Sequence, residues 1–261
     1  MTLSPATPAT PATPATPTAP AAPAAQMTVA VVLPALDEER SLPSVLAALA
    51  AQEPGAGSRL DRIVVADNGS SDRTAAVASA CGAMVVREPR RGYGAACLAA
   101  LAVLRSDPPD MVAFLDADGS DDPAQLPEVL APILAGTADL TIGSRALGAA
   151  EPGALTVPQV WGNRLAVTLM HGLFGVRFTD LGPFRAILWP ALERLAMRDR
   201  GFGWTVEMQA RALRAGLRCV EVPVRYRRRA AGRSKVAGTV RGAFGAGAKI
   251  LATIARVRLG G

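Results

Sequence analysis

The sequence of 261 residues is poor in the side chains that build several common kinds of site. Its single histidine, His171, is better explained as a structural residue than as a metal ligand. The three cysteines, Cys81, Cys97 and Cys219, lack the spacing of a zinc site or a disulfide framework. We therefore expect them to be small core residues in a reducing compartment, which predicts a cytoplasmic protein. No uninterrupted apolar run reaches the length of about 18 residues that a transmembrane helix needs.

Aromatic residues make up only 4% of the chain, too few for the stacking platforms of a nucleic-acid binder, so we expect no nucleic-acid partner. The charge is unevenly distributed. From Arg218 to the end there are eleven Lys or Arg and a single acid, Glu221. This end of the chain therefore predicts an anionic partner, for which phosphate groups and anionic lipid remain as candidates.

Three regions differ in composition. Residues 1–26 consist mainly of Ala, Thr and Pro, carry no charged side chain, and predict a disordered leader. They lack the basic start and continuous apolar stretch of a secretory signal. We expect the fold over residues 27–238 and a basic amphipathic segment over residues 239–261.

Short apolar runs alternate with helical patterns through the first half of the fold, which predicts an α/β protein with a mostly parallel sheet. The expected strands are residues 29–33, 63–66, 83–86, 111–115 and 140–142, and the expected helices begin near 42, 74, 94 and 126. Ser41 is the expected N-cap of the first helix. In the second half we expect an apolar strand before Asp180, helices around 165–174 and 205–215, and a strand over 217–226.

Four aspartates follow the strand that ends at Leu115, in the stretch Asp116-Ala117-Asp118-Gly119-Ser120-Asp121-Asp122. Hard oxygen ligands suit Mg²⁺ or Mn²⁺, which proteins usually bind through one or two carboxylates together with substrate phosphates. The alternative is an acidic turn in which Asp122 starts the next helix. Polar or glycine-rich clusters also follow the other strands, at residues 34–39, 67–71 and 143–145. Because ligands bind at the carboxyl ends of strands in such sheets, this convergence predicts a site there.

With these motifs in this order, residues 27–238 resemble the inverting family 2 glycosyltransferases of the GT-A fold, and in particular the dolichyl- or polyprenyl-phosphate mannosyl and glucosyl synthases. The resemblance divides the fold into a nucleotide-sugar half, residues 27–146, and an acceptor half, residues 147–238. It rests on Val31–Glu39, Asp67–Thr74, Gly92-Tyr93-Gly94, Asp116-Ala117-Asp118, Gly143-Ser144-Arg145, Asp180–Arg185 and Arg229–Lys235.

The resemblance also implies a set of site residues and a divalent cofactor, Mg²⁺ or Mn²⁺. Asp116 and Asp118 would contact the ribose and the metal on the diphosphate. The implied nucleotide-sugar contacts are Pro34, Leu36, Glu38, Asp67, Asp116, Ala117 and Asp118, with Arg145, Arg229, Ser234 and Lys235 as phosphate clamps. The family branch often continues the acidic pair with Leu-Gln, whereas this chain has Gly119-Ser120, which leaves a place for Asp121 near the metal.

Asp180 is the expected catalytic residue, with Glu207 as the competing carboxylate. An ionised Asp180 could take a proton from an acceptor hydroxyl, or orient an acceptor phosphate that needs no deprotonation. A loop-capping Asp bonded to backbone amides is the structural alternative.

The expected reaction is transfer of a hexose, with inversion, from a UDP- or GDP-sugar to a polyprenyl phosphate at the inner membrane face. Two alternatives remain: a soluble retaining synthase with a water-soluble acceptor, and a non-catalytic nucleotide-binding module. Val240, Phe244, Gly247, Leu251 and Ile254 recur at helical spacing beside Arg241, Lys249 and Arg256. Such a helix either lies on a membrane surface or packs back on the enzyme.

Overall fold

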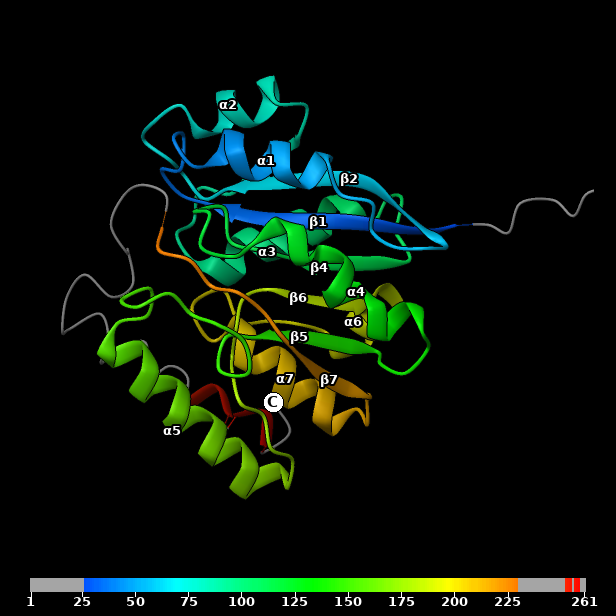
Figure 1. Cartoon of the computed structure of the whole chain (residues 1–261), viewed down its shortest axis with the longest axis vertical. Helices are drawn as coiled ribbons and strands as arrows, with labels where there is room; N and C mark the ends of the chain where they lie inside the picture. Colours follow the sequence, from blue (N-terminus) through cyan, green and yellow to red (C-terminus); the bar gives the residue numbers. More distant parts are fainter. Residues whose placement is uncertain (1–25, 230–251, 255, 259–261) are drawn as a thin grey trace, which may run out of the picture.

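A computed structural model describes residues 26–229, 252–254 and 256–258. Residues 1–25 of the leader, together with Ser234, Lys235 and most of the basic C-terminal segment, lie outside the described residues. The described part forms a seven-stranded sheet with helices on both faces (Figure 1).

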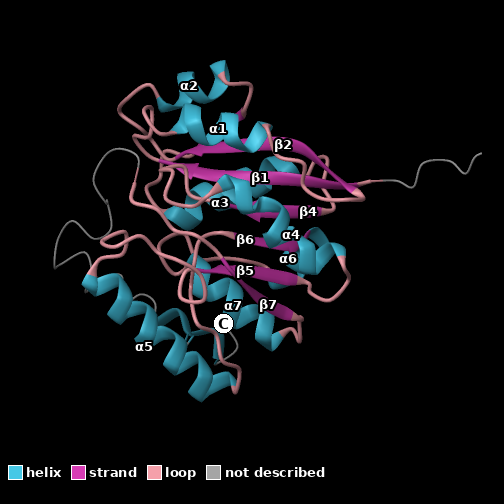
Figure 2. Cartoon of the chain, in the orientation of Figure 1, coloured by secondary structure: helices cyan, strands magenta, loops and turns pink. Residues whose placement is uncertain are grey.

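The sheet is mostly parallel, as the sequence predicts. Its order is β3-β2-β1-β4-β6-β5-β7, which Figure 2 shows in magenta. Only β6 runs antiparallel, between β4 and β5. The strands are β1 (Met27–Ala35), β2 (Ser58–Asp67), β3 (Met84–Arg87), β4 (Met111–Phe114), β5 (Leu140–Ser144), β6 (Arg185–Leu188) and β7 (Cys219–Pro223).

Helices bury both faces of the sheet, which is why β1 is apolar along most of its length. Val29, Val31 and Leu33 belong to the core beneath α1 and α4, while Ala30 and Val32 belong to the core beneath α3 and α7. The helices are α1 (Leu42–Ala50), α2 (Thr74–Ala80), α3 (Tyr93–Leu104), α4 (Leu126–Leu134), α5 (Val157–Phe174), α6 (Trp189–Leu195) and α7 (Trp204–Arg214), with a 3₁₀ turn at Pro123–Gln125.

Three sequence-based expectations are wrong in detail. No strand leads directly into Asp180; instead β6 follows it. β6 is short and begins with a buried arginine, so the sequence does not show the apolar pattern of a strand there. Ser41 stands at the N-cap position of α1 as expected, but its side chain makes no capping bond, because its hydroxyl donates to the Glu38 carboxylate instead. Cys81 is exposed at the end of α2, whereas Cys97 is buried and Cys219 half-buried.

The described C-terminal residues, 252–254 and 256–258, are helical and pack back on the protein. Ile254 and Val257 are each 1% exposed in the core beneath α7, and the Arg214 guanidinium donates to the Val257 carbonyl. Of the two arrangements expected for the C-terminal segment, these described residues adopt the one that packs back on the enzyme. Among the described residues, no helix combines the length and apolarity needed to cross a membrane.

Candidate active site

A cavity of about 260 Å³ opens at the carboxyl ends of β1 and β4, beside the start of α3. Seven of the predicted donor-site residues line it: Pro34, Leu36, Glu38, Asp116, Ala117, Asp118 and Arg229. Asn68, Arg91, Tyr93 and Phe202 also line it, and the sequence assigned none of these a role. The Tyr93 hydroxyl is buried without a hydrogen-bond partner among the described residues, so it could bond to a ligand.

A larger depression, of about 860 Å³, lies at the opposite edge of the sheet, near the start of β2. Its best-formed ion pairs join Asp61 to Arg59 and Arg62, and these charges satisfy one another. The smaller cavity is the better candidate because buried carboxylates and a partly exposed arginine converge on it.

The acidic turn after β4 concentrates negative charge at the cavity. Asp118 is 3% exposed; its Oδ1 accepts hydrogen bonds from the Ser120 N–H (2.8 Å) and hydroxyl (2.5 Å). Asp121 accepts from the Asp116 N–H at 3.1 Å through one oxygen, whereas its other oxygen, Oδ1, is buried without a partner among the described residues. Burial raises the pKa of Asp121 to about 7, and the nearby Asp118 charge adds to the shift. Burial, Asp118 and Asp121 likewise raise the pKa of Asp116 well above its usual range.

These residues fit a divalent cation that is shared with a ligand. The part of the chain that the structure describes has no group of three or more His, Cys, Asp or Glu able to hold a metal alone. However, the Asp121 oxygen without a partner in the described chain and the closely spaced carboxyl groups, which together with burial raise the pKa of Asp116, form an arrangement that a bound cation would stabilise. Mg²⁺ and Mn²⁺ sites of this kind complete their coordination with substrate phosphates.

Arg229 closes one side of the cavity, and its side chain is 28% exposed. It lies 2.8 Å from Asp118 Oδ2 and 3.6 Å from Glu38 Oε1, so it joins the acidic turn to the loop after β1. Asp67, although predicted as a nucleotide contact, does not line the cavity. Its Oδ1 accepts from the Ser70 N–H at 3.0 Å, within the turn after β2.

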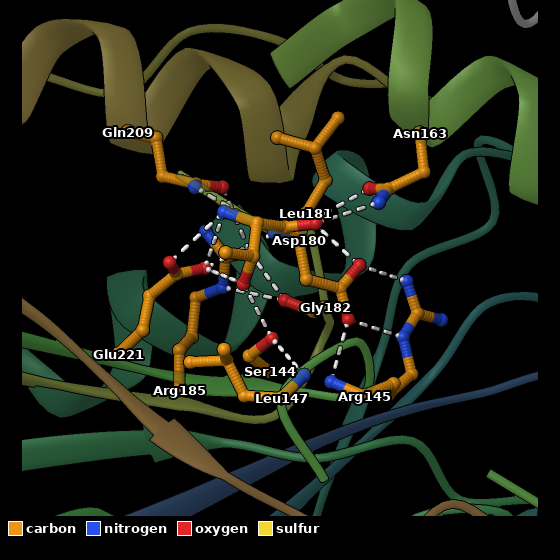
Figure 3. Close-up of polar contacts among 11 residues, drawn as sticks. Ser144, Arg145, Leu147, Asn163, Asp180, Leu181, Gly182, Arg185, Gln209 and Glu221 are labelled. Carbon is orange, nitrogen blue, oxygen red and sulfur yellow. Dashed lines mark hydrogen bonds and ion pairs between the residues drawn. The ribbon is translucent and has the colours of Figure 1, made fainter. Parts of the chain in front are cut away.

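Asp180 is paired with Arg145 rather than open to a substrate (Figure 3). Arg145 donates from Nε and Nη2, each at 2.7 Å, and from its backbone N–H at 2.8 Å; the Leu181 N–H adds a fourth bond at 2.8 Å. The side chains of Asp180 and Arg145 are 2% and 13% exposed. Burial alone would lower the pKa of Arg145, but the bonds to Asp180 outweigh it and raise that pKa. Arg145 also lies over the Tyr226 ring, 5.0 Å from its centre.

Several partly buried polar side chains hold the loop around Asp180, and the sequence predicted none of these contacts (Figure 3). Glu221 on β7 accepts from the backbone N–H groups of Thr179 and Asp180. Asn163 on α5 bonds both the Thr179 carbonyl and the Leu181 N–H. The one hint in the sequence was Glu221 itself, an acid inside an otherwise apolar strand.

Arg185 is fully buried and fixes the end of the same loop. It donates to the Gly182 and Thr205 carbonyls and to the Gln209 side chain, and among the described residues it forms no ion pair with a carboxylate. Burial lowers its pKa to about 10. The loop is therefore tied to α7 by a buried cation bonded only to neutral acceptors.

Glu207, the competing carboxylate, has a structural role. It is 2% exposed and accepts from the N–H groups of Arg198 and Asp199 and from the Arg211 side chain. The loop that it holds runs against the start of α3. There the Gly94 N–H donates to the Gly201 carbonyl, and a Cβ on Gly94 would lie 2.0 Å from the Asp199 carbonyl oxygen.

The order of the strands, the helices on both faces and the acidic turn at the carboxyl edge define a GT-A fold. The model of the family described as Glycosyl transferase family 2 matches residues 30–195. The chain belongs to that family.

Relatives of known sequence and structure agree with this assignment. An uncharacterized glycosyltransferase of Mycobacterium tuberculosis is 42% identical over 83% of this chain and 93% of its own length. The undecaprenyl-phosphate mannosyltransferase of Micrococcus luteus is 31% identical over 83% of this chain and 90% of its own length. Among solved structures, glucosyl-3-phosphoglycerate synthase of M. tuberculosis, in complex with Mn²⁺, UDP and glucosyl-3-phosphoglycerate, aligns with a TM-score of 0.69 and 25% identity. That alignment covers 88% of this chain and 80% of the synthase.

Proposed function

We propose that the chain transfers a hexose from a UDP- or GDP-sugar to a polyprenyl phosphate, with inversion at the anomeric carbon. The observation that carries the proposal is a single cavity lined by charged and apolar side chains. The charged ones include Asp116, Asp118 and Arg229, and the apolar ones include Pro34, Leu36 and Phe202. The undecaprenyl-phosphate mannosyltransferase among the relatives supports the acceptor class.

On the donor side, Pro34 and Leu36 would form the wall against the base, and Glu38 would accept hydrogen bonds from the nucleoside. Asp116 and Asp118 would hold the cation, which would neutralise charge on the leaving diphosphate when bound. Arg229 now neutralises Asp118, and in the donor complex it would turn to the diphosphate, joined by Ser234 and Lys235.

On the acceptor side, Asp180 would act as a positioning residue that fixes Arg145. Both of its oxygens already accept two hydrogen bonds, which makes it a poor acceptor of a further proton. An acceptor phosphate needs no base because its oxygen is already ionised. In the reaction this oxygen bonds to the anomeric carbon as the bond to the diphosphate oxygen breaks, and the diphosphate leaves with the electron pair. No proton is transferred. Arg145 would steady the acceptor phosphate.

A second candidate is a synthase with a small phosphorylated acceptor that reacts through a hydroxyl. The likeness to glucosyl-3-phosphoglycerate synthase supports it. This alternative differs in outcome, because it predicts transfer in the absence of lipid.

The test is a transfer assay with the full chain, Mn²⁺ or Mg²⁺, and radiolabelled UDP- and GDP-hexoses. Polyprenyl phosphate and 3-phosphoglycerate are supplied in separate reactions, with Asp118→Ala as the inactive control. We expect label in the lipid phase and a product of inverted anomeric configuration. Transfer only to phosphoglycerate would replace the first candidate by the second, and no transfer from any donor would refute both.

A further inference from the structure

Helix α5 carries a stripe of large apolar side chains that point away from the core. The helix has 18 residues and begins with a capping box formed by Thr156 and Gln159. Its outer stripe and the loop that follows expose Val157 (70%), Trp161 (66%), Leu165 (52%), Leu173 (42%) and Val176 (40%). The spacing of four residues between Val157, Trp161 and Leu165 places these three along one face.

The opposite face of α5 anchors it to the protein. Ala166 and Met170 are 1% and 0% exposed in the main core. Figure 1 shows α5 along the lower edge of the molecule, at the end of the sheet that carries β7. The exposed stripe is therefore held on a fixed helix, because the inner face is packed.

The charge of this segment has one sign. Between Val157 and Arg177 the sequence contains Arg164 and Arg177 but no Asp or Glu, and both arginines are exposed. A helix with a tryptophan and aliphatic residues on one face, flanked by basic side chains, has the composition of helices that lie in a lipid interface. Tryptophan itself favours this depth because its ring is apolar and its N–H is polar.

We propose that α5 is a lipid-surface helix that lies in the headgroup region of a membrane with Val157, Trp161 and Leu165 inserted. The size of the stripe favours lipid over a second copy of the chain. A stable dimer buries about 800 Å² per partner, contributed by some 20–30 residues. Here Val157, Trp161 and Leu165 form a line only one helix wide and about 12 Å long, because a helix rises about 1.5 Å per residue.

The position of α5 links this surface to the active site. Asn163, on the same helix, bonds the Thr179 carbonyl and the Leu181 N–H on either side of Asp180. A membrane bound along α5 would therefore lie next to the loop that positions Arg145. The inference itself does not depend on the identity of the acceptor, because it concerns binding to a lipid surface that contains none.

The test measures binding of the full chain to phosphatidylcholine vesicles at high salt, where attraction by the basic residues near the C-terminus is screened. Co-sedimentation gives the partition constant. Trp161 emission gives a second readout, because Trp189 and Trp204 are 9% and 0% exposed and already lie in the protein interior. We expect wild type to bind with a shift of the emission to shorter wavelength.

The variant Trp161→Ser/Leu165→Ser should weaken binding about 100-fold, since burial of each large apolar side chain corresponds to a tenfold or larger change in a partition constant. Met84→Ser/Val103→Ser is the matched control, because these residues are 41% and 37% exposed on β3 and α3, away from α5. This control should bind like wild type, and circular dichroism checks that both variants fold.

Two outcomes would overturn the proposal. One is equal vesicle binding by wild type and the Trp161→Ser/Leu165→Ser variant, including binding that appears only with anionic vesicles at low salt. The other is absence of vesicle binding by wild type together with a dimer in sedimentation velocity that this variant abolishes. The second result would assign the stripe to a second copy of the chain. Neither result would affect transfer to a detergent-dispersed acceptor, so the proposed function stands or falls separately.

Discussion

The substitution Asp180→Asn removes the charge from a buried carboxylate that accepts four hydrogen bonds. The new amide nitrogen would have to face two N–H donors, whichever way the side chain is oriented. Arg145, with only 13% of its side chain exposed, would keep its charge without its partner. Breaking a buried ion pair by removing one member costs about 3–5 kcal/mol of unfolding free energy.

For a domain of this size that loss corresponds to a decrease in Tm of about 6–20 °C. We also expect kcat to fall by about 100-fold or more, because a displacement of about 1 Å in a positioning group can cost that much. The donor Kd should change little, since Asp180 does not line the donor cavity. Differential scanning calorimetry and steady-state kinetics measure the two effects.

The chain contains a matched control for the effect on stability. Asp139 accepts from the backbone N–H, Nε and Nη2 of Arg218, the same three donors that Arg145 offers to Asp180. The Arg218 side chain is 55% exposed, however, and solvent screens this pair. Asp139→Asn should therefore lower Tm far less than Asp180→Asn. Equal decreases in Tm for the two variants would show that burial of the Asp180 pair does not have the energetic role given to it here.

The remaining predictions concern the metal, the glycines and pH. Asp118→Ala should abolish transfer while Tm stays above the assay temperature, and chelation of wild type should do the same until Mn²⁺ is restored; full activity in excess chelator would contradict the metal role. Gly94→Ala should destabilise the fold, because its Cβ would lie 2.0 Å from a carbonyl oxygen, whereas Gly162→Ala meets nothing within 4 Å and should raise stability by up to about 1 kcal/mol in thermal unfolding. The bonds from Arg218 lower the pKa of Asp139, so the pair stabilises the fold above the unfolded pKa of about 3.9 and this contribution is lost as the pH falls through the lower folded pKa. The Tm difference between wild type and Asp139→Asn should therefore shrink as the solution is acidified, and a difference that does not change with acidification would contradict this reasoning.

Glu207→Gln, the equivalent change at the competing carboxylate, is unsuitable as a mild control for Asp180→Asn. Glu207 holds two backbone N–H groups and Arg211 in a buried position. Its replacement should lower stability and disturb the loop beside Phe202. A fall in activity of this variant would therefore carry no information about proton transfer.

The sequence by itself determined the α/β class, the positions of β1, β2, β4 and β5, and the grouping of most predicted donor-site residues around one cavity. These follow from short-range patterns: apolar runs long enough to be buried on both faces, each followed by a polar turn at the carboxyl end. Pro34 lies at the end of β1, Glu38 lies just beyond it, and Asp116 and Asp118 follow β4. Their arrival at one cavity therefore follows from the parallel pairing of these two neighbouring strands.

The tertiary structure decided the surroundings of Asp180. β6 pairs antiparallel between β4 and β5, a choice made by long-range packing that four residues beginning with an arginine do not encode locally. The pairing of Asp180 with Arg145 joins residues 35 positions apart, and the support from Glu221 reaches across a further 41. The sequence likewise does not predict the exposure of Trp161. Apolar residues that recur at helical spacing give the same pattern whether their face packs on the core or lies in solvent. Only the docking of the opposite face of α5, through Ala166 and Met170, fixes which stripe remains outside.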